Sequence, residues 1–166
     1  MTTFNSGYAV WVVDDESQVL ESQKAFLGAS GFEVATFSNP LEAEEKLPNA
    51  AEFLVFILDH DFSMAGMSSY VGYDFSSKVR STYFLGRAAP IIYVTGRESR
   101  ENFQIAKSAN PGLVPNIYFA KNELASEPQK LIEALADAYE YLEELETLID
   151  QHGFETALGI VTDWRF

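Results

Sequence analysis

The stretch that decides the fold is Glu52-Phe53-Leu54-Val55-Phe56-Ile57-Leu58, an apolar run that leads directly into Asp59. A continuous apolar run of this length is typical of a strand that is buried on both faces, as in a parallel sheet covered by helices. Asp59 then stands at the carboxyl end of that strand. Because parallel strands end at one edge of the sheet, we expect this carboxylate to meet polar groups from other strand ends.

Comparable apolar runs recur along the chain and alternate with segments of helical periodicity. Five strands that alternate with helices predict a parallel sheet with helices on both faces, because right-handed crossovers place them on each side. The fold class is therefore α/β, with a five-stranded, doubly wound parallel sheet. The expected strands are residues 8–13, 33–37, 52–58, 90–94 and 116–120, and the expected helices between them are 17–29, 40–47, 73–84 and 98–108.

Polar residues follow four of these strands directly. The acidic pair Asp14-Asp15 follows the first strand, Asp59 the third, Thr95 the fourth and Lys121 the fifth. A carboxylate at such an edge can act as a nucleophile toward a phosphoryl group. Neighbouring carboxylates would repel one another unless a cation lay between them, and clustered oxygen ligands suit Mg²⁺. An ammonium group and a hydroxyl can hold phosphoryl oxygens. Each residue alone has an ordinary structural explanation, but the joint placement outlines a phosphoryl-transfer site.

The composition of the chain excludes several classes of protein. Its 166 residues fit one domain with a sizeable core, and 47% hydrophobic with 22% charged residues is typical of a globular protein. The net charge of −14 would repel a phosphate backbone, so direct nucleic-acid binding is not expected. No apolar stretch reaches the roughly 18 residues that span a bilayer. The absence of cysteine removes disulfides and thiolate chemistry. A cytoplasmic location fits these properties best.

Over roughly residues 7–135 the chain resembles the response-regulator receiver domain of two-component signalling, which has a flavodoxin-like fold. The resemblance rests on the order and spacing of four motifs, which are Val12-Val13-Asp14-Asp15-Glu16, Ile57-Leu58-Asp59, Val94-Thr95-Gly96 and Phe119-Ala120-Lys121.

The resemblance implies a role for each motif. Asp59 would accept a phosphoryl group from a histidine kinase or a histidine phosphotransfer protein, with Thr95 and Lys121 assisting. Mg²⁺ would be bound by Asp15, Asp59 and the backbone carbonyl of Asp61, with Asp14 assisting. Thr95 would also act as a switch together with Tyr118, an aromatic residue that turns inward. Such a domain receives a phosphoryl group, and its self-dephosphorylation would not make it a turnover enzyme acting on a separate substrate.

Two departures from the receiver pattern concern the site. If Gly72 is the glycine that usually follows the phosphoacceptor strand, about five residues are inserted in the loop 60–72, which could form a lid or alter partner choice. We interpret His60 in this loop as an exposed residue, with a metal ligand or relay as the alternative. Lys121 is followed by Asn122 where the family commonly has proline, so the lysine loop is expected to be set differently.

Two other functions remain as alternatives. The segment 56–63 also looks like the nucleophile motif of haloacid-dehalogenase-type phosphatases, with Asp59 as nucleophile and Asp61 as general acid/base. Those enzymes need paired metal-binding acids after the lysine, and no such pair follows Lys121 at a strand end. A pseudo-receiver that serves only as a binding module is disfavoured by the complete set of site residues.

The C-terminal third of the chain contains helices through which a signal could pass to another protein. We expect a receiver core over residues 1–125, its last helix extended over 126–151, and a short amphipathic helix over 152–166. Acids crowd the long helix, but all except Glu146 lie away from its apolar seam, which permits a homodimer through the C-terminal helices. The alternative is that both helices cover the domain's own surface. Two interpretations of the chain remain open: it is part of a longer protein that carries an effector domain, or it is a single-domain regulator that acts by protein contact. The seam consists of Leu131, Leu135, Ala138, Leu142, Leu145 and Ile149.

Overall fold

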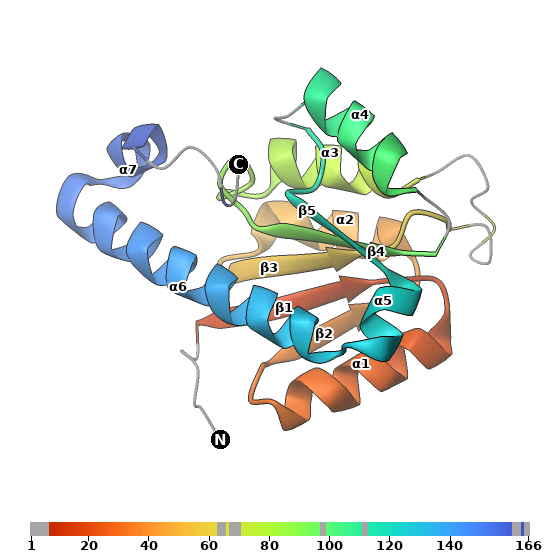
Figure 1. Ribbon diagram of the computed structural model, residues 1–166. Helices are drawn as coiled ribbons and strands as arrows, with labels where there is room; N and C mark the ends of the chain where they lie inside the picture. Colours follow the sequence, from red (N-terminus) through yellow and green to blue (C-terminus); the bar gives the residue numbers. More distant parts are fainter. Residues whose placement is uncertain are drawn as a thin grey trace.

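The computed structural model describes residues 7–62, 66, 71–96, 99–110, 113–160 and 164. Its centre is a sheet of five parallel strands in the order β2-β1-β3-β4-β5, which confirms the predicted fold class (Figure 1). The three inner strands are almost wholly buried, as their continuous apolar sequences predicted. The strands are β1 (Tyr8–Val13), β2 (Val34–Phe37), β3 (Phe53–Leu58), β4 (Ile91–Thr95) and β5 (Ile117–Ala120).

Helices cover both faces of this sheet. In Figure 1, α6 crosses in front of the strands, while α2, α3 and α4 lie on the far side. Residues of α1, α5 and the start of α6 line one common groove, so these three helices share a face. The helices are α1 (Ser17–Ala29), α2 (Pro40–Lys46), the 3₁₀ turn η1 (Leu47–Asn49), α3 (Gly72–Thr82), α4 (Arg100–Ala109), α5 (Lys121–Ser126), α6 (Gln129–His152) and α7 (Phe154–Ile160).

The register of the sheet brings the predicted site residues to one edge. Val13 pairs with Leu58 across β1 and β3, and the Asp59 amide donates to the Val13 carbonyl at 3.0 Å. On the other side, Thr95 at the end of β4 pairs with Ala120 at the end of β5. The strands therefore end level with one another, and the residues that follow them share the carboxyl edge.

The segment after β5 differs from the sequence prediction. A separate short helix, α5, follows β5 directly, and the long helix begins at Gln129 rather than at Ser126. Pro128 explains the break, because a proline disfavours the helical conformation in the residue before it. Glu127 accordingly has φ −132° and ψ 68°, outside the helical region.

The apolar seam of α6 is used within the chain. Of its predicted members, Leu131, Leu135, Ala138, Leu142 and Leu145 are buried and Ile149 is partly buried. The seam is buried within its own chain, where α6 contacts both β3 and α7. Coverage of the domain's own surface, the second of the two sequence interpretations, therefore describes these residues.

The short helix α7 folds back from the end of α6. It buries Ala157 and Leu158, and Phe154 stacks on Phe84 with ring centroids 6.1 Å apart. Trp164 is also buried, whereas Val161, which belongs to the predicted helix 152–166, lies outside the described residues. Most of the inserted loop, residues 63–65 and 67–70, lies outside them as well. Within the described part of the chain, no helix has both the length and the apolar character needed to cross a bilayer.

Candidate functional site

Three carboxylates form the centre of the site. Ligand oxygens of Asp14, Asp15 and Asp59 all lie within 4.8 Å of one another. Asp14 is 3% exposed and Asp59 is 4% exposed, whereas Asp15 is only partly buried. The backbone amide of Glu16 donates to Asp14 Oδ1 at 2.9 Å and fixes that carboxylate. The structure thus brings together the acidic pair after β1 and the acid after β3, as the sequence predicted.

Lys121 reaches the same cluster from the other side of the sheet edge. Its Nζ lies 3.1 Å from Asp14 Oδ2, 3.5 Å from Asp59 Oδ2 and 3.4 Å from Glu16 Oε1. The position of Lys121 follows from the local structure, because it is the first residue of α5. The described residues contain no cis peptide bond. Helix α5 begins at the lysine itself, and a difference from the lysine loop of other receivers stays a prediction.

Burial is the main cause of raised pKa values at two carboxylates of the site, Asp14 and Asp59. Desolvation, together with the Asp59 carboxylate, raises the pKa of Asp14 to about 6, against the opposing effect of Lys121. Desolvation also raises the pKa of Asp59, although Lys121 and hydrogen bonds from His60 and Thr95 act the other way. Burial of Lys121 alone would lower its pKa, but Asp14 and Asp59 outweigh it and the pKa is raised. The cluster therefore holds more negative charge than its ammonium group offsets.

The remaining predicted residues lie beside this cluster. Thr95 is fully buried, and its side chain hydrogen-bonds Asp59. Tyr118 is 8% exposed, and the Arg100 guanidinium lies 4.9 Å from its ring centroid. The switch role predicted for Tyr118 stays a prediction. Asp61 forms an isolated antiparallel bridge with Val71. The role predicted for its backbone carbonyl stays a prediction.

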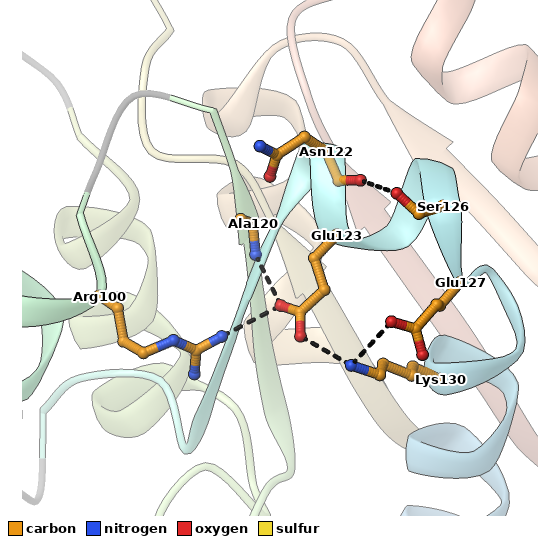
Figure 2. Close-up of polar contacts among 7 residues, drawn as sticks. All are labelled: Arg100, Ala120, Asn122, Glu123, Ser126, Glu127 and Lys130. Atoms are coloured by element: carbon orange, nitrogen blue, oxygen red, sulfur yellow. Dashed lines mark hydrogen bonds and ion pairs between the residues drawn. The ribbon is translucent and has the colours of Figure 1, made fainter.

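Helix α5 is held by the Glu123 carboxylate (Figure 2). One oxygen of Glu123 accepts from Arg100 of α4 at 3.0 Å and from the Ala120 amide at 3.4 Å, and the other pairs with Lys130 of α6 at 3.0 Å. Such exposed pairs contribute little to stability. They do fix the geometry of the helix whose first residue is Lys121.

Sequence reasoning missed the environment of His60. The structure places this residue half-buried at the base of the loop, where its Nδ1 contacts the hydroxyl of Tyr93 on β4. Its ring also packs edge-on against Tyr73, with centroids 5.5 Å apart. The interpretation of His60 as an exposed loop residue was wrong, because the Tyr93 hydroxyl from β4, the next strand along the chain and the neighbour of β3 in the sheet, lies beside it. The signal available in the sequence was a tyrosine inside the otherwise apolar β4 run.

Comparison with known proteins agrees with this geometry. The sequence matches the response regulator receiver domain family over residues 10–114, which is more than half of the chain. The chain belongs to the response regulator receiver domain family. No curated protein sequence matches it.

Solved receiver structures share the fold. A response regulator receiver domain protein from Clostridium thermocellum is 26% identical, with a TM-score of 0.64, over 83% of this chain and 98% of that one. A CheY-like receiver domain protein from Methanospirillum hungatei is 23% identical, with a TM-score of 0.61, over 82% of this chain and 97% of that one. The receiver domain of a modulated diguanylate cyclase from Desulfovibrio desulfuricans is 23% identical, with a TM-score of 0.61, over 83% and 97%.

The acidic cluster of this receiver domain fits the Mg²⁺ that receiver domains generally bind. Carboxylate oxygens are the ligands that this hard cation prefers, and the Asp14, Asp15 and Asp59 oxygens lie close enough to share one ion. Burial is the largest cause of the raised pKa values of Asp14 and Asp59, and a bound cation would stabilise both charged carboxylates.

Proposed function

We propose that this receiver domain is a phosphoacceptor of a two-component phosphorelay, phosphorylated on Asp59. The observation that carries the proposal is the setting of that carboxylate. It is buried at the strand end, 3.5 Å from the Lys121 ammonium, hydrogen-bonded by Thr95 and grouped with two further acids. A surface aspartate that only caps a turn needs none of these neighbours.

The proposed reaction joins an Asp59 oxygen to the phosphorus of a phosphohistidine on a histidine kinase or phosphotransfer protein. The O–P bond forms as the donor's P–N bond breaks, and the imidazole leaves with the electron pair and takes a proton from solvent. Lys121 and Thr95 are placed to hold the phosphoryl oxygens. Asp14 and Asp15, with Asp59 and the Asp61 carbonyl, would hold Mg²⁺, which when bound neutralises negative charge on the transferring group.

Apolar surface beside the site supports a protein as the phosphodonor. A groove of about 470 Å³ between α1, α5 and α6 extends from Lys121. Its walls include Phe26, Leu124 and Leu131, and the Phe26 side chain is 36% exposed. A protein donor can bury this surface while its phosphohistidine faces Asp59. The same proposal places the chain in the cytoplasm, because a histidine kinase takes its phosphoryl group from ATP.

Phosphorylation is proposed to change association with another protein through the surface near Thr95 and Tyr118. A homodimer through the C-terminal helices remains part of the proposal. It would have to use other residues than the α6 seam, which is buried within one chain. The net charge of −14 supports protein rather than nucleic acid as the partner.

The test is labelling by a small phosphodonor such as acetyl phosphate. With Mg²⁺, the wild-type chain should gain one phosphoryl group by intact mass, and chelation of Mg²⁺ should abolish the gain. Asp59→Asn should gain none, and Asp150→Asn, which changes an exposed acid on α6, should label normally. Equal labelling of wild type and Asp59→Asn would refute the assignment of Asp59. Repeated turnover of a small phosphoester without a partner would instead favour the phosphatase.

The mass of the assembly should be measured beside the labelling. A monomer before and after labelling would refute a phosphorylation-driven homodimer while leaving the phosphoacceptor role intact.

A further inference from the structure

His60 is held at the base of the loop that follows the phosphoacceptor. The Gly72 amide donates to the His60 carbonyl at 2.9 Å, and the Asp61–Val71 bridge lies next to it. The chain therefore leaves and re-enters the core at neighbouring points. The His60 ring, which contacts the Tyr93 hydroxyl through Nδ1, lies directly at this point.

The backbone of His60 contacts the reacting carboxylate. Its amide donates to Asp59 Oδ1 at 2.7 Å, while Asp59 Oδ2 faces Lys121 Nζ at 3.5 Å. The two oxygens of Asp59 thus have different partners. The His60 amide sets the rotation of the carboxylate and therefore the direction in which Oδ2 points.

Tyr93 is rigidly placed to hold this residue. Its side chain is fully buried and stacks on Tyr73 at 5.2 Å and on Phe103 at 5.9 Å. A Cβ added to Gly72 would lie 2.4 Å from Tyr93 Cε1 and 2.4 Å from the Asp59 carbonyl oxygen. The glycine thus leaves room for the Tyr93 ring next to the Asp59 backbone. The hydroxyl is fixed with respect to β4, which also carries Thr95.

We propose that the Tyr93 hydroxyl is a positioning group for phosphorylation. By holding the His60 ring, it keeps the His60 amide on Asp59 Oδ1 and so keeps Oδ2 directed toward Lys121. Tyr93 acts through His60 and does not itself touch the phosphoryl group. This inference rests on the proposed role of Asp59 as phosphoacceptor.

The central variant is Tyr93→Phe, which keeps the stacked ring and removes only the hydroxyl. The rate of labelling by acetyl phosphate at saturating Mg²⁺ should fall about 3- to 10-fold, as expected for loss of one hydrogen bond. Tyr141→Phe is the matched control. It removes a hydroxyl that donates to the Ala88 carbonyl at 2.6 Å, on α6 and away from the site, and should label at the wild-type rate.

Variants of His60 separate positioning from general stability. His60→Leu should slow labelling as Tyr93→Phe does, whereas His60→Gln, whose amide can still bond the hydroxyl, should recover most of the rate. The double variant Tyr93→Phe/His60→Leu should be no slower than the slower single variant, because both changes break one interaction.

A direct measurement follows the His60 amide itself. In wild type its proton resonance should lie downfield, as expected for a bond to a carboxylate, and in Tyr93→Phe it should move upfield. A purely structural hydroxyl would lower the melting temperature but leave this resonance and the labelling rate unchanged.

The outcomes distinguish the two proposals. If the wild-type chain is labelled, and Tyr93→Phe shows the same labelling rate and the same His60 amide resonance, only the positioning role is overturned. Additive rate effects in the double variant would also overturn it. Failure of the wild-type chain to label would overturn both the phosphoacceptor role and the inference that rests on it.

Discussion

Two carboxylates at the sheet edge, Asp14 and Asp59, lie almost entirely out of water, with the Lys121 ammonium beside both. Removing a charge from water costs free energy, and a like charge nearby adds to that cost. Because this cost falls on the charged form, it raises the pKa of Asp14 to about 6. The arrangement weakens the metal-free protein while preparing a site for a cation and a phosphoryl group.

A prediction for Asp14→Asn follows from this shift. Between its ordinary pKa of 3.8 and the folded value of about 6, the native protein binds more protons than the unfolded chain, so the free energy of unfolding falls as pH rises. Without Mg²⁺, the variant should therefore be more stable than wild type at pH 8, by about 3 kcal/mol at most. The difference should vanish near pH 4.

Urea denaturation at pH 4, 6 and 8 checks this prediction. Asp150→Asn is the control, since this acid is exposed on α6. If Asp14→Asn were less stable than wild type at pH 8, the ion pair with Lys121 would outweigh the cost of burying the charge.

Among the elements, α6 has an apolar pattern that is compatible both with a coiled coil between two chains and with packing inside one domain. A heptad seam is typical of a coiled coil, but here the seam is buried within its own chain, where α6 contacts β3 and α7. Tyr139 contributes by packing edge-on against Tyr8 of β1, with ring centroids 5.5 Å apart. The helix is therefore part of the domain core rather than a free dimerisation surface along this face.

Leu142→Ala tests this assignment. Leu142 is 0% exposed, so its truncation should lower the free energy of unfolding by about 2–5 kcal/mol through lost burial and a cavity. Urea denaturation measures the loss, and sedimentation equilibrium should show an unchanged mass. Glu143→Ala, at the exposed neighbouring position, should change stability by no more than about 0.5 kcal/mol. A smaller assembly with unchanged monomer stability would identify the seam as an interface.

At the scale of the whole molecule, buried polar contacts join the C-terminal segment to the core. Trp164 donates from Nε1 to Asp137 Oδ2 at 3.0 Å, and its carbonyl accepts from Asn116 Nδ2 at 3.0 Å. Asn116 Oδ1 in turn accepts from the Ile91 amide at 2.8 Å and from Arg80 at 3.0 Å. One network thus connects α3, β4, α6 and the segment after α7.

Loss of Trp164 should therefore destabilise the receiver core. Trp164→Ala should lower the free energy of unfolding by about 3–5 kcal/mol, because a buried aromatic side chain and its hydrogen bond are removed. Denaturation followed by circular dichroism measures this. Ile160→Ala, at a position 54% exposed on α7, is the control and should be nearly neutral. An equally small effect at Trp164 would show that the core does not depend on the C-terminal segment.

The parallel sheet, and the edge at which Asp14, Asp59, Thr95 and Lys121 meet, could be predicted from the order of residues alone. Continuous apolar runs that alternate with helical segments favour strands buried between layers of helices, and the carboxyl ends of parallel strands lie at one edge, so both results follow from the order of residues. The buried β3 run and the level strand ends are the elements that carry this success.

The partners of side chains that meet across the fold could not be predicted in this way, because they depend on how the elements pack. His60 contacts Tyr93 because β3 and β4 are neighbours, and Trp164 reaches Asn116 because the chain reverses after α6 and returns to the core. The seam of α6 could equally have met a second chain, and its burial depended on contacts that the sheet and α7 of the same chain offer. Local patterns specify which face of an element is apolar, but the identity of the partner depends on contacts between residues distant in sequence.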